Sequence, residues 1–460
     1  MGRRSVRLGM AAGVLLAGVA AVPAHANTPV ACSDTALIQA INNSNAGLND
    51  HILDLTSYCV YTLTDADGTL PVITQPLVIH GHNATIRRDP NATTDFRIFE
   101  VGATSLTMDT LTVMNGNAGG ANGGGVFLGT SGGSLTTTDV NFQGNSASFG
   151  GAIQAGSGTD LSLTGGTISD NHAVFGGGVH AASATVVTLN TVTVTRNLAG
   201  GFGGGVDLLT TLPATITNCS ISHNTAREAG GGLFYSGTNS VSVTGSTITD
   251  NRVTNSADGG GGVFFDPGIG GTGTFTNSTI SGNAVTGFTT NDGFSNRGGG
   301  LFAASGQLTL DNTKVTANQL IGAFGQGAGI AAAGNDGVAT LTLQNGTTLT
   351  RNLASGRYSQ GGGLYTDSST NGVTVFVTGS HIDANKVTGT GSATAGIYNN
   401  GGTWAVLTNS TVNNNTAPIA PAPGGIYTTV AITNTAGSTF TGNTPTNCLL
   451  SPQPVTGCVN

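Results

Sequence analysis

The residues of this sequence that could best carry out chemistry are His180 and Asp207. Each directly follows the phrase Gly-Gly-Gly-Val, and the two lie 27 positions apart. A histidine hydrogen-bonded to a carboxylate can act as a general acid or base. An ordinary polar contact between two neighbouring strands would use the same residues, and this simpler interpretation is the one we favour.

The same position after later Gly-Gly-aliphatic phrases is aromatic in six copies: Phe234, Phe264, Phe302, Tyr365, Tyr398 and Tyr427. The preceding residue is always aliphatic, so the two-residue period of a strand predicts that it faces the core and that the ring faces outward. Outward rings often mark a binding face. Stacking on sugar rings or docking of a partner would use this face, whereas self-stacking under neighbouring loops would remove it. Both interpretations stay open.

Two further groups could bind or react. The residue before a recurring asparagine is charged in four successive copies, at Asp170, Arg196, His223 and Asp250. These four predict an exposed charge ladder, with a small calcium site as the alternative; otherwise no metal or cofactor is expected. The segment 79–83, Ile-His-Gly-His-Asn, is interpreted as a surface turn without a carboxylate pair. Glycoside hydrolases need two carboxylates, and the sequence has no Asp-Asp pair.

These residues belong to a repeat that occupies 122–443. A Gly-Gly-aliphatic phrase alternates with an aliphatic-x-x-Asn phrase, eleven copies of each, at intervals of 26 to 38 residues. The asparagines are Asn145, Asn171, Asn197, Asn224, Asn251, Asn283, Asn318, Asn352, Asn385, Asn415 and Asn443. Such a period indicates a solenoid, a propeller or an array. Short Thr- and Val-rich runs of period two lie between the phrases, so each copy predicts three strands of one parallel β-helix coil.

Stacked coils would explain both phrases. Equivalent asparagines would lie above one another and pass hydrogen bonds from coil to coil, and glycine would supply the positive φ of the turns. From each asparagine to the next aliphatic position the chain spans 8 or 9 residues in the early copies and 11 to 18 in the later ones. The extra loops, the longest at 284–297, should therefore lie beside the aromatic position.

The phrases Phe-Gln-Gly-Asn (142–145) and Gly-Gly-Ala-Ile (150–153) resemble the two short motifs of the polymorphic outer-membrane-protein repeat. Variants of both recur over 122–443, most of the chain. The resemblance implies a right-handed parallel β-helix of the pectate-lyase-like superfamily, and known members of the family include adhesins. The expected fold class is therefore all-β, a right-handed parallel β-helix with an N-terminal capping helix.

Along the chain we predict four segments. Residues 1–26 have the basic start, the apolar stretch and the Ala-His-Ala end (24–26) of a secretory signal peptide. Residues 27–75 form an N-terminal cap that resembles the caps of other secreted actinobacterial β-helix proteins, with a helix from an N-cap at Asp34 to a stop at Gly47. Residues 76–443 form the β-helix, and 444–460 form a disulfide-clipped tail.

The five cysteines suit an exported chain. We predict disulfides Cys32–Cys59 and Cys448–Cys458, one at each end of the rod, and a buried, unreactive Cys219. Without the three arginines of the signal segment, 11 Lys and Arg oppose 22 Asp and Glu. This balance disfavours nucleic acids and anionic membrane surfaces as partners.

No residue cluster names a reaction. The first hypothesis is a secreted, extracellular or cell-surface-associated, monomeric and non-catalytic protein that binds a polysaccharide or another cell-surface component, as adhesins do. The alternative is a polysaccharide lyase or glycoside hydrolase that uses His180 and Asp207. Ice or mineral binding by Thr-x-Thr arrays fits the composition, but runs such as Thr-Val-Thr-Val-Thr (191–195) look too irregular. No membrane-inserting segment is expected.

Overall fold

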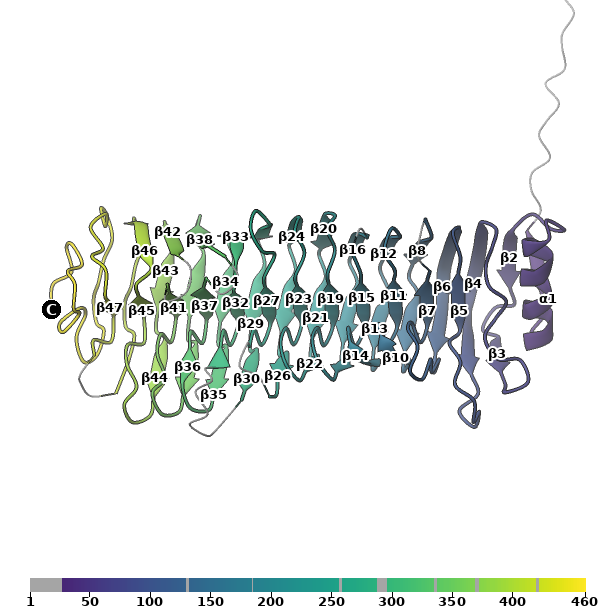
Figure 1. The fold of residues 1–460 in the computed structure, drawn as a ribbon, viewed down its shortest axis with the longest axis horizontal. Coiled ribbons are helices and arrows are strands. Elements are labelled where there is room, and N and C mark those ends of the chain that lie inside the picture. The colour runs from purple at the N-terminus through teal and green to yellow at the C-terminus, as the bar shows by residue number, and fades with distance from the viewer. Residues whose placement is uncertain are drawn as a thin grey trace, which may run out of the picture.

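In the computed structural model the chain is a right-handed parallel β-helix, drawn out into a rod with one helix across its N-terminal end (Figure 1). The predicted fold class is confirmed. The structure describes residues 27–129, 132–183, 185–255, 259–287, 296–334, 337–368, 372–418 and 422–460. The predicted signal peptide, 1–26, lies outside the described residues.

Each repeat copy is one coil that contributes strands to three sheets. In the coil that starts at Ile153, β11 (Ile153–Ala155) belongs to sheet 2, β12 (Asp160–Thr164) and β13 (Thr167–Ser169) belong to sheet 1, and β14 (His172–Phe175) belongs to sheet 3. Sheet 1 thus has a first strip of strands such as β12 and a second strip such as β13. Equivalent strands of successive coils pair in parallel, as β11 with β15, β12 with β16 and β13 with β17.

The same order holds along the rod. The first strip of sheet 1 contains β8 (Ser134–Thr138), β12, β16 (Val186–Asn190), β20 (Ala214–Thr217), β24 (Ser240–Thr244), β28 (Thr272–Thr276), β33 (Gly306–Asp311), β38 (Ala339–Gln344), β42 (Val373–Thr378) and β46 (Thr403–Thr408). The second strip contains β9 (Asn141–Gln143), β13, β17 (Thr193–Thr195), β21 (Ser220–Ser222), β25 (Thr247–Thr249), β29 (Thr279–Ser281), β34 (Lys314–Thr316), β39 (Thr348–Thr350) and β43 (His381–Asp383). Sheet 2 contains β5 (Phe99–Val101), β7 (Val126–Leu128), β11, β15 (Val179–Ala181), β19 (Val206–Leu208), β23 (Leu233–Tyr235), β27 (Val263–Phe265), β32 (Leu301–Ala303), β37 (Ile330–Ala333), β41 (Leu364–Asp367), β45 (Ile397–Asn400) and β47 (Ile426–Thr428). Sheet 3 contains β10 (Ser146–Phe149), β14, β18 (Leu198–Ala199), β22 (Thr225–Ala226), β26 (Arg252–Val253), β30 (Ala284–Thr286), β35 (Gln319–Ile321), β40 (Leu353–Ser355) and β44 (Lys386–Thr388). Outside the three sheets, β31 (Asn296–Arg297) pairs with β36 (Gly325–Gln326).

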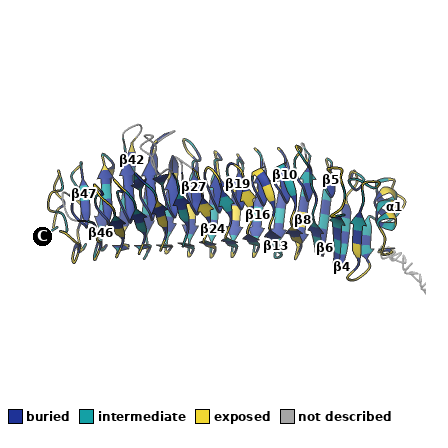
Figure 2. Cartoon of the chain, turned by 90° about the horizontal axis from the view of Figure 1, so that it is seen from below, coloured by how far each residue is buried: buried dark blue, intermediate teal, exposed yellow. Residues whose placement is uncertain are grey.

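The lumen of the rod is filled by one continuous hydrophobic core. Inward residues alternate with outward ones along each strand, as Leu161 and Leu163 do on β12, and both of these are buried. Figure 2 shows such buried positions in dark blue along the strands of successive coils. Because each coil covers the apolar face of the one below, no coil could bury this core alone.

The asparagine column is confirmed as a buried ladder. Asn197 accepts hydrogen bonds at Oδ1 from the backbone N–H (3.0 Å) and the Nδ2 (2.9 Å) of Asn171, and its own Nδ2 donates to Asn224 Oδ1 (2.9 Å) and to the Ile168 carbonyl (2.9 Å). The same contacts recur at each step from Asn145 to Asn443. The ladder therefore satisfies polar groups at the turn between sheet 1 and sheet 3.

A second ladder of hydroxyl groups, absent from the sequence-based prediction, lies at the short turn between the two strips of sheet 1. Ser246 Oγ accepts from the backbone N–H of Cys219 (3.0 Å), and Ser278 Oγ accepts from that of Ser246 (3.2 Å). Thr313 and Thr347 continue it. Cys219 is buried at the start of this ladder, and burial raises the pKa of its thiol, which agrees with the predicted unreactive cysteine.

The two ends are closed differently. At the N-terminus α1 (Asp34–Asn45) packs Leu37 and Ile41 against β1 (Thr28–Val30) and β3 (Val60–Leu63), which join sheet 1 with β2 (Ile52–Leu55), β4 (Leu77–Arg88) and β6 (Ser105–Met114). The N-cap is Ser33, whose hydroxyl accepts from the Ala36 N–H at 3.1 Å, so the predicted cap at Asp34 is wrong by one residue. The hydroxyl of Ser33 reaches that N–H because its backbone is still extended.

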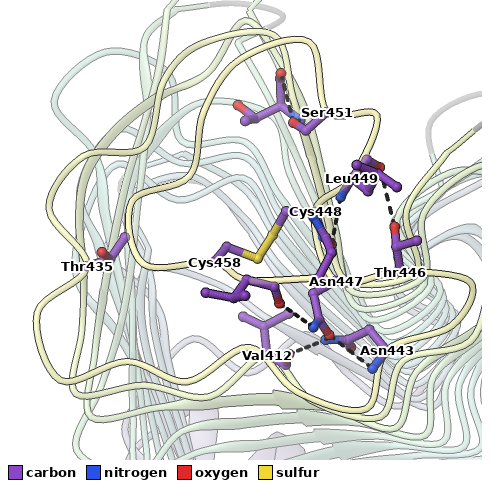
Figure 3. Close-up of a disulfide and its surroundings, with 12 residues drawn as sticks. Val412, Thr435, Asn443, Thr446, Asn447, Cys448, Leu449, Ser451 and Cys458 are labelled. Atoms are coloured by element: carbon purple, nitrogen blue, oxygen red, sulfur yellow. Dashed lines mark hydrogen bonds between the residues drawn. A yellow bond between two sulfur atoms is a disulfide. The ribbon is translucent and has the colours of Figure 1, made fainter.

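Both predicted disulfides are present. Cys32–Cys59 ties the start of α1 to β3, and Cys448–Cys458 closes the C-terminal tail. Figure 3 shows the second bond beside the last rung of the ladder, where Asn443 Nδ2 donates to Asn447 Oδ1 at 2.9 Å. Each bond thus holds an end of the rod, where a parallel solenoid would otherwise expose an unpaired edge.

Candidate functional site

The predicted catalytic pair lies on two adjacent strands of sheet 2. Gln154 on β11, His180 on β15, Asp207 on β19 and Phe234 on β23 occupy one column in direct register. His180 Nδ1 lies 2.7 Å from Asp207 Oδ2. The two residues are only 4% and 1% exposed, so this is a buried dyad rather than a polar contact on the surface.

The dyad has unused hydrogen-bonding capacity. Asp207 Oδ1 and the neighbouring Gln154 Oε1 are buried and have no hydrogen-bond partner among the described residues. Burial raises the pKa of Asp207, while the hydrogen bond and the charge of His180 oppose that rise. Because His180 is held through Nδ1, its Nε2 stays available to a second partner.

Tight glycine turns place these side chains. Gly176 and Gly203 have φ of +63° and +64°. A Cβ on Gly176 would lie 2.8 Å from the Cβ of His180, and one on Gly203 would lie 2.5 Å from the Cβ of Asp207. The turn before each strand of sheet 2 therefore folds back over the residue four positions later, and only glycine fits. This is why the column points away from the lumen and is nevertheless covered.

Phenylalanines that the sequence-based prediction missed form the wall above the dyad. Phe149, Phe175 and Phe202 each lie directly before the glycines of three successive copies. Their rings stack along the rod, with centroids 5.2 Å apart for Phe149 and Phe175 and 5.6 Å apart for Phe175 and Phe202. Phe149 also meets the His180 ring edge-on at 5.1 Å. All three rings are half-buried, so each keeps an open side.

Together these residues enclose a pocket of about 330 Å³. It is lined by Phe149, Phe175, His180, Phe202, Asp207, Leu209, Phe234 and Ser236. Aromatic walls around a few polar groups are typical of small-molecule sites. The sequence does carry a signal for this pocket. A phenylalanine directly precedes the glycines in the three copies that contain Gln154, His180 and Asp207, and in no other copy.

The six rings that the sequence places on the outward column are mostly covered. Phe302 and Tyr365 are 0% and 2% exposed, and Phe234 and Phe264 are both 7% exposed. For these four rings the structure agrees with the second of the two interpretations, self-stacking under neighbouring segments. The glycine turns lie over them, and the rings stack on one another, as Phe234 does on Phe264 at 4.8 Å. Only Phe234 reaches the pocket. A binding role for the six stays a prediction.

The later rings form a separate tyrosine stack. Tyr365 and Tyr398 have centroids 5.7 Å apart, and Tyr398 and Tyr427 are 4.6 Å apart. The Tyr365 hydroxyl accepts a hydrogen bond from Gln326 Nε2 at 3.0 Å. Burial raises the pKa of Tyr398 to about 12 and raises that of Tyr365 as well. Most of the long loop predicted beside this stack, 284–297, lies outside the described residues.

The predicted charge ladder is present in part. Arg196 Nε and Nη2 donate to the two carboxylate oxygens of Asp170 at 2.7 and 2.8 Å, which holds the pKa of Asp170 below its usual range. Asp170, Arg196, His223 and Asp250 all have φ between +54° and +59°, the position that Gly144 and Gly282 occupy in other coils. Within the described part of the chain no three His, Cys, Asp or Glu side chains gather as around a metal ion. Calcium binding is untested and stays a prediction.

The segment 79–83 is a turn, but each of its histidines has a carboxylate partner. His80 Nδ1 lies 2.6 Å from Asp109 Oδ2, and His82 Nε2 lies 3.1 Å from Asp54 Oδ1. The sequence interpretation of a turn without a carboxylate pair missed these two partners, because Asp54 and Asp109 come from neighbouring coils. All four side chains are about one-third to one-half exposed, so the group lies on an open surface.

Fold and site together define a β-helix protein with an aromatic pocket on the outer side of sheet 2. No protein family and no curated protein matches this sequence. One solved structure, the A-module of the mannuronan C-5 epimerase AlgE6 of Azotobacter vinelandii, aligns over 92% of this chain and 97% of its own, with 12% identity and a TM-score of 0.37. At these values the likeness carries no argument about activity. Separately, no described helix is long and apolar enough to cross a membrane.

Proposed function

We propose that this chain is an exported protein that binds a neutral carbohydrate and seats one sugar unit in the aromatic pocket. The observation that carries the proposal is the set of half-buried rings of Phe149, Phe175 and Phe202 above the buried pair His180 and Asp207. Aromatic faces suit the C–H faces of a sugar ring, and the polar floor suits its hydroxyls. A sugar hydroxyl that reached Asp207 Oδ1 would satisfy an oxygen that now has no described partner.

A neutral sugar fits better than an acidic one. The residues that line the pocket include one carboxylate and neither lysine nor arginine. An anionic sugar would therefore meet the Asp207 carboxylate, and the one cationic group that could face it, His180, is already hydrogen-bonded to Asp207. The repulsion between the two anions is strong in low dielectric surroundings. Export and an adhesin-like role remain part of the proposal; the two disulfides and the resemblance to the polymorphic outer-membrane-protein repeat support them.

The test is a glycan array followed by calorimetry on the best ligand. Phe175→Ala removes the central ring of the wall and should weaken binding about tenfold, which corresponds to about 1.4 kcal/mol. The matched control is Phe324→Ala, because Phe324 is also half-buried and stacks on an aromatic ring, that of Tyr358, away from the pocket. Absence of binding by the wild type, or equal loss in both variants, would contradict the proposal.

A second candidate, a polysaccharide lyase or glycosidase, rests on the geometry of the dyad. A carboxylate on Nδ1 fixes the ring of His180 and leaves Nε2 free to accept a proton, which is the arrangement of a general base and its positioning partner. Incubation with neutral and acidic polysaccharides, followed by assays of reducing ends and unsaturated products, tests this candidate. Product formation that His180→Gln abolishes while binding persists would favour it, and no product from the wild type would remove it.

A further inference from the structure

Sheet 1 carries a continuous face of side-chain hydroxyl groups. Two of the outward positions on each strand, taken over both strips and five successive coils, give 20 positions. Of these, 19 are Ser or Thr, and two of them, Ser169 and Thr195, are buried. The first strip contributes Ser162, Thr164, Thr188, Asn190, Thr215, Thr217, Ser242, Thr244, Thr274 and Thr276. The second strip contributes Thr167, Ser169, Thr193, Thr195, Ser220, Ser222, Thr247, Thr249, Thr279 and Ser281. We call these 20 positions the hydroxyl face.

The Thr-rich runs that look too irregular for such an array in the sequence lie in register in the structure. Thr217, Thr244 and Thr276 lie 27 and 32 residues apart, yet their Cα atoms pair directly. Turns of different length absorb the difference, and the strands stay in register.

The hydroxyls form a two-dimensional lattice. Paired residues of neighbouring coils lie about 4.8 Å apart, and residues two apart on one strand lie about 6.6 Å apart. Figure 1 shows the strands of successive coils stacked nearly straight along the rod. Such straight stacking is unusual for a sheet and needs side-chain ladders to hold it, which the asparagine and Ser/Thr ladders supply. Threonine adds stiffness, because its branched Cβ restricts χ1.

The hydroxyl lattice is specific to sheet 1 and does not simply follow from the high Ser and Thr content of the chain. The outward positions of sheet 3 over the same coils are His172, Leu198, Thr225, Arg252 and Ala284, a mixture of charged, apolar and polar residues. Charged residues flank the hydroxyl face, at Asp170 and Arg196 and at Asp160, the exposed first residue of β12, but none of the 20 positions is charged. Aromatic residues and carboxylates, which sugar-binding sites use, are also missing from these positions.

We propose that the hydroxyl face binds the surface of ice. Each hydroxyl both donates and accepts hydrogen bonds, as water does, and the lattice presents these groups at regular repeats in two directions. A single hydrogen bond between a hydroxyl and a water molecule is weak. Many such bonds on a rigid, regularly spaced face add up, because the protein loses its translational and rotational freedom only once. The uncharged face suits this ligand, because an ion orients water around itself and breaks the lattice order.

The proposal does not depend on carbohydrate binding. The test grows ice slowly from a solution of the full-length protein and compares the protein concentration in the ice with that in the remaining liquid. The wild type should be enriched in the ice. The double variant Thr215→Lys, Thr274→Lys places two strongly hydrated ammonium groups on exposed positions of the face and should be excluded. The matched control is Thr254→Lys, because Thr254 is equally exposed but follows sheet 3 strand β26.

A second variant, Thr215→Val with Thr274→Val, removes hydroxyls while it keeps side-chain shape, and circular dichroism confirms the fold of each protein. Loss of ice enrichment in this variant as well, with enrichment kept in Phe175→Ala, would support the proposal. Exclusion of the wild type from ice would overturn it. Unchanged enrichment in both double variants would also overturn it. So would a wild type that does not bind ice but binds crystalline chitin or cellulose, if the lysine variant loses that binding.

Discussion

Removal of one rung of the asparagine ladder should destabilise the rod locally and by a large amount. Asn224 is fully buried, and its Oδ1 accepts from the backbone N–H (3.0 Å) and the Nδ2 (2.9 Å) of Asn197. Its Nδ2 donates to the Val194 carbonyl (2.9 Å) and to Asn251 Oδ1 (3.0 Å). Asn224→Ala therefore removes the acceptor of two buried donor groups of Asn197, its backbone N–H and one hydrogen of its Nδ2.

Each unpaired buried group costs about 1–3 kcal/mol, so the local opening free energy should fall by about 2–6 kcal/mol. A single global unfolding midpoint is a poor measure here, because a stacked array does not unfold in one transition. Hydrogen exchange followed by mass spectrometry measures each segment instead. Since about 1.4 kcal/mol is a factor of ten, peptides around Asn197 should exchange at least about 30-fold faster.

The matched control is Asn190→Ala. Asn190 lies on the outer side of β16, half-buried, and its side chain makes no hydrogen bond to a described residue. Its substitution should change stability by less than about 0.5 kcal/mol. Equal exchange rates in Asn224→Ala and Asn190→Ala would refute the claim that the ladder holds the coils together. The double variant of Asn224 and Asn251 should cost less than the sum of the single variants, because the two share a hydrogen bond.

Three other changes give separate tests. Gly203→Ala should cost more than about 1–2 kcal/mol, because it combines a φ of +64° with a Cβ 2.5 Å from that of Asp207. Gly120→Ala, where nothing lies within 4 Å of the added Cβ, should be near neutral, and hydrogen exchange of the surrounding peptides measures both effects. Replacement of both Cys32 and Cys59 by serine opens a link between residues 27 positions apart and should cost about 3–4 kcal/mol in the chain-entropy description; unchanged hydrogen exchange in α1 would contradict this. Burial raises the pKa of Asp207 in the folded state, so stability relative to Asp207→Asn should be greatest below about pH 4 and fall as the pH rises through the folded pKa. Hydrogen exchange of the peptides around position 207, compared between the two proteins at each pH from 4 to 7, measures that difference, and a constant or rising difference would refute it.

The sequence by itself determined the β-helix, its register and its internal ladder. Eleven alternating copies of two short phrases permit few other folds, since each residue type repeats where a stacked coil needs it: Asn at a turn, Gly at a positive φ, and aliphatic residues toward the lumen. The positions of Cys32, Cys59, Cys448 and Cys458 at the two ends likewise sufficed to predict both disulfides.

Only the tertiary structure decided which outward side chains are exposed and which residues they contact. The sequence places His180, Asp207 and the later rings on an outward column. Only the path of the glycine turns shows that these turns cover the column. The structure also shows that Phe149, Phe175 and Phe202 form the wall of a pocket. It also brings Asp54 and Asp109 beside the histidines of 79–83, and it aligns hydroxyls whose sequence intervals differ. The physical reason is the same in each case. Periodicity fixes which way a side chain leaves its own strand, whereas its exposure and its partners depend on loops and on coils about 4.8 Å away that local sequence does not specify.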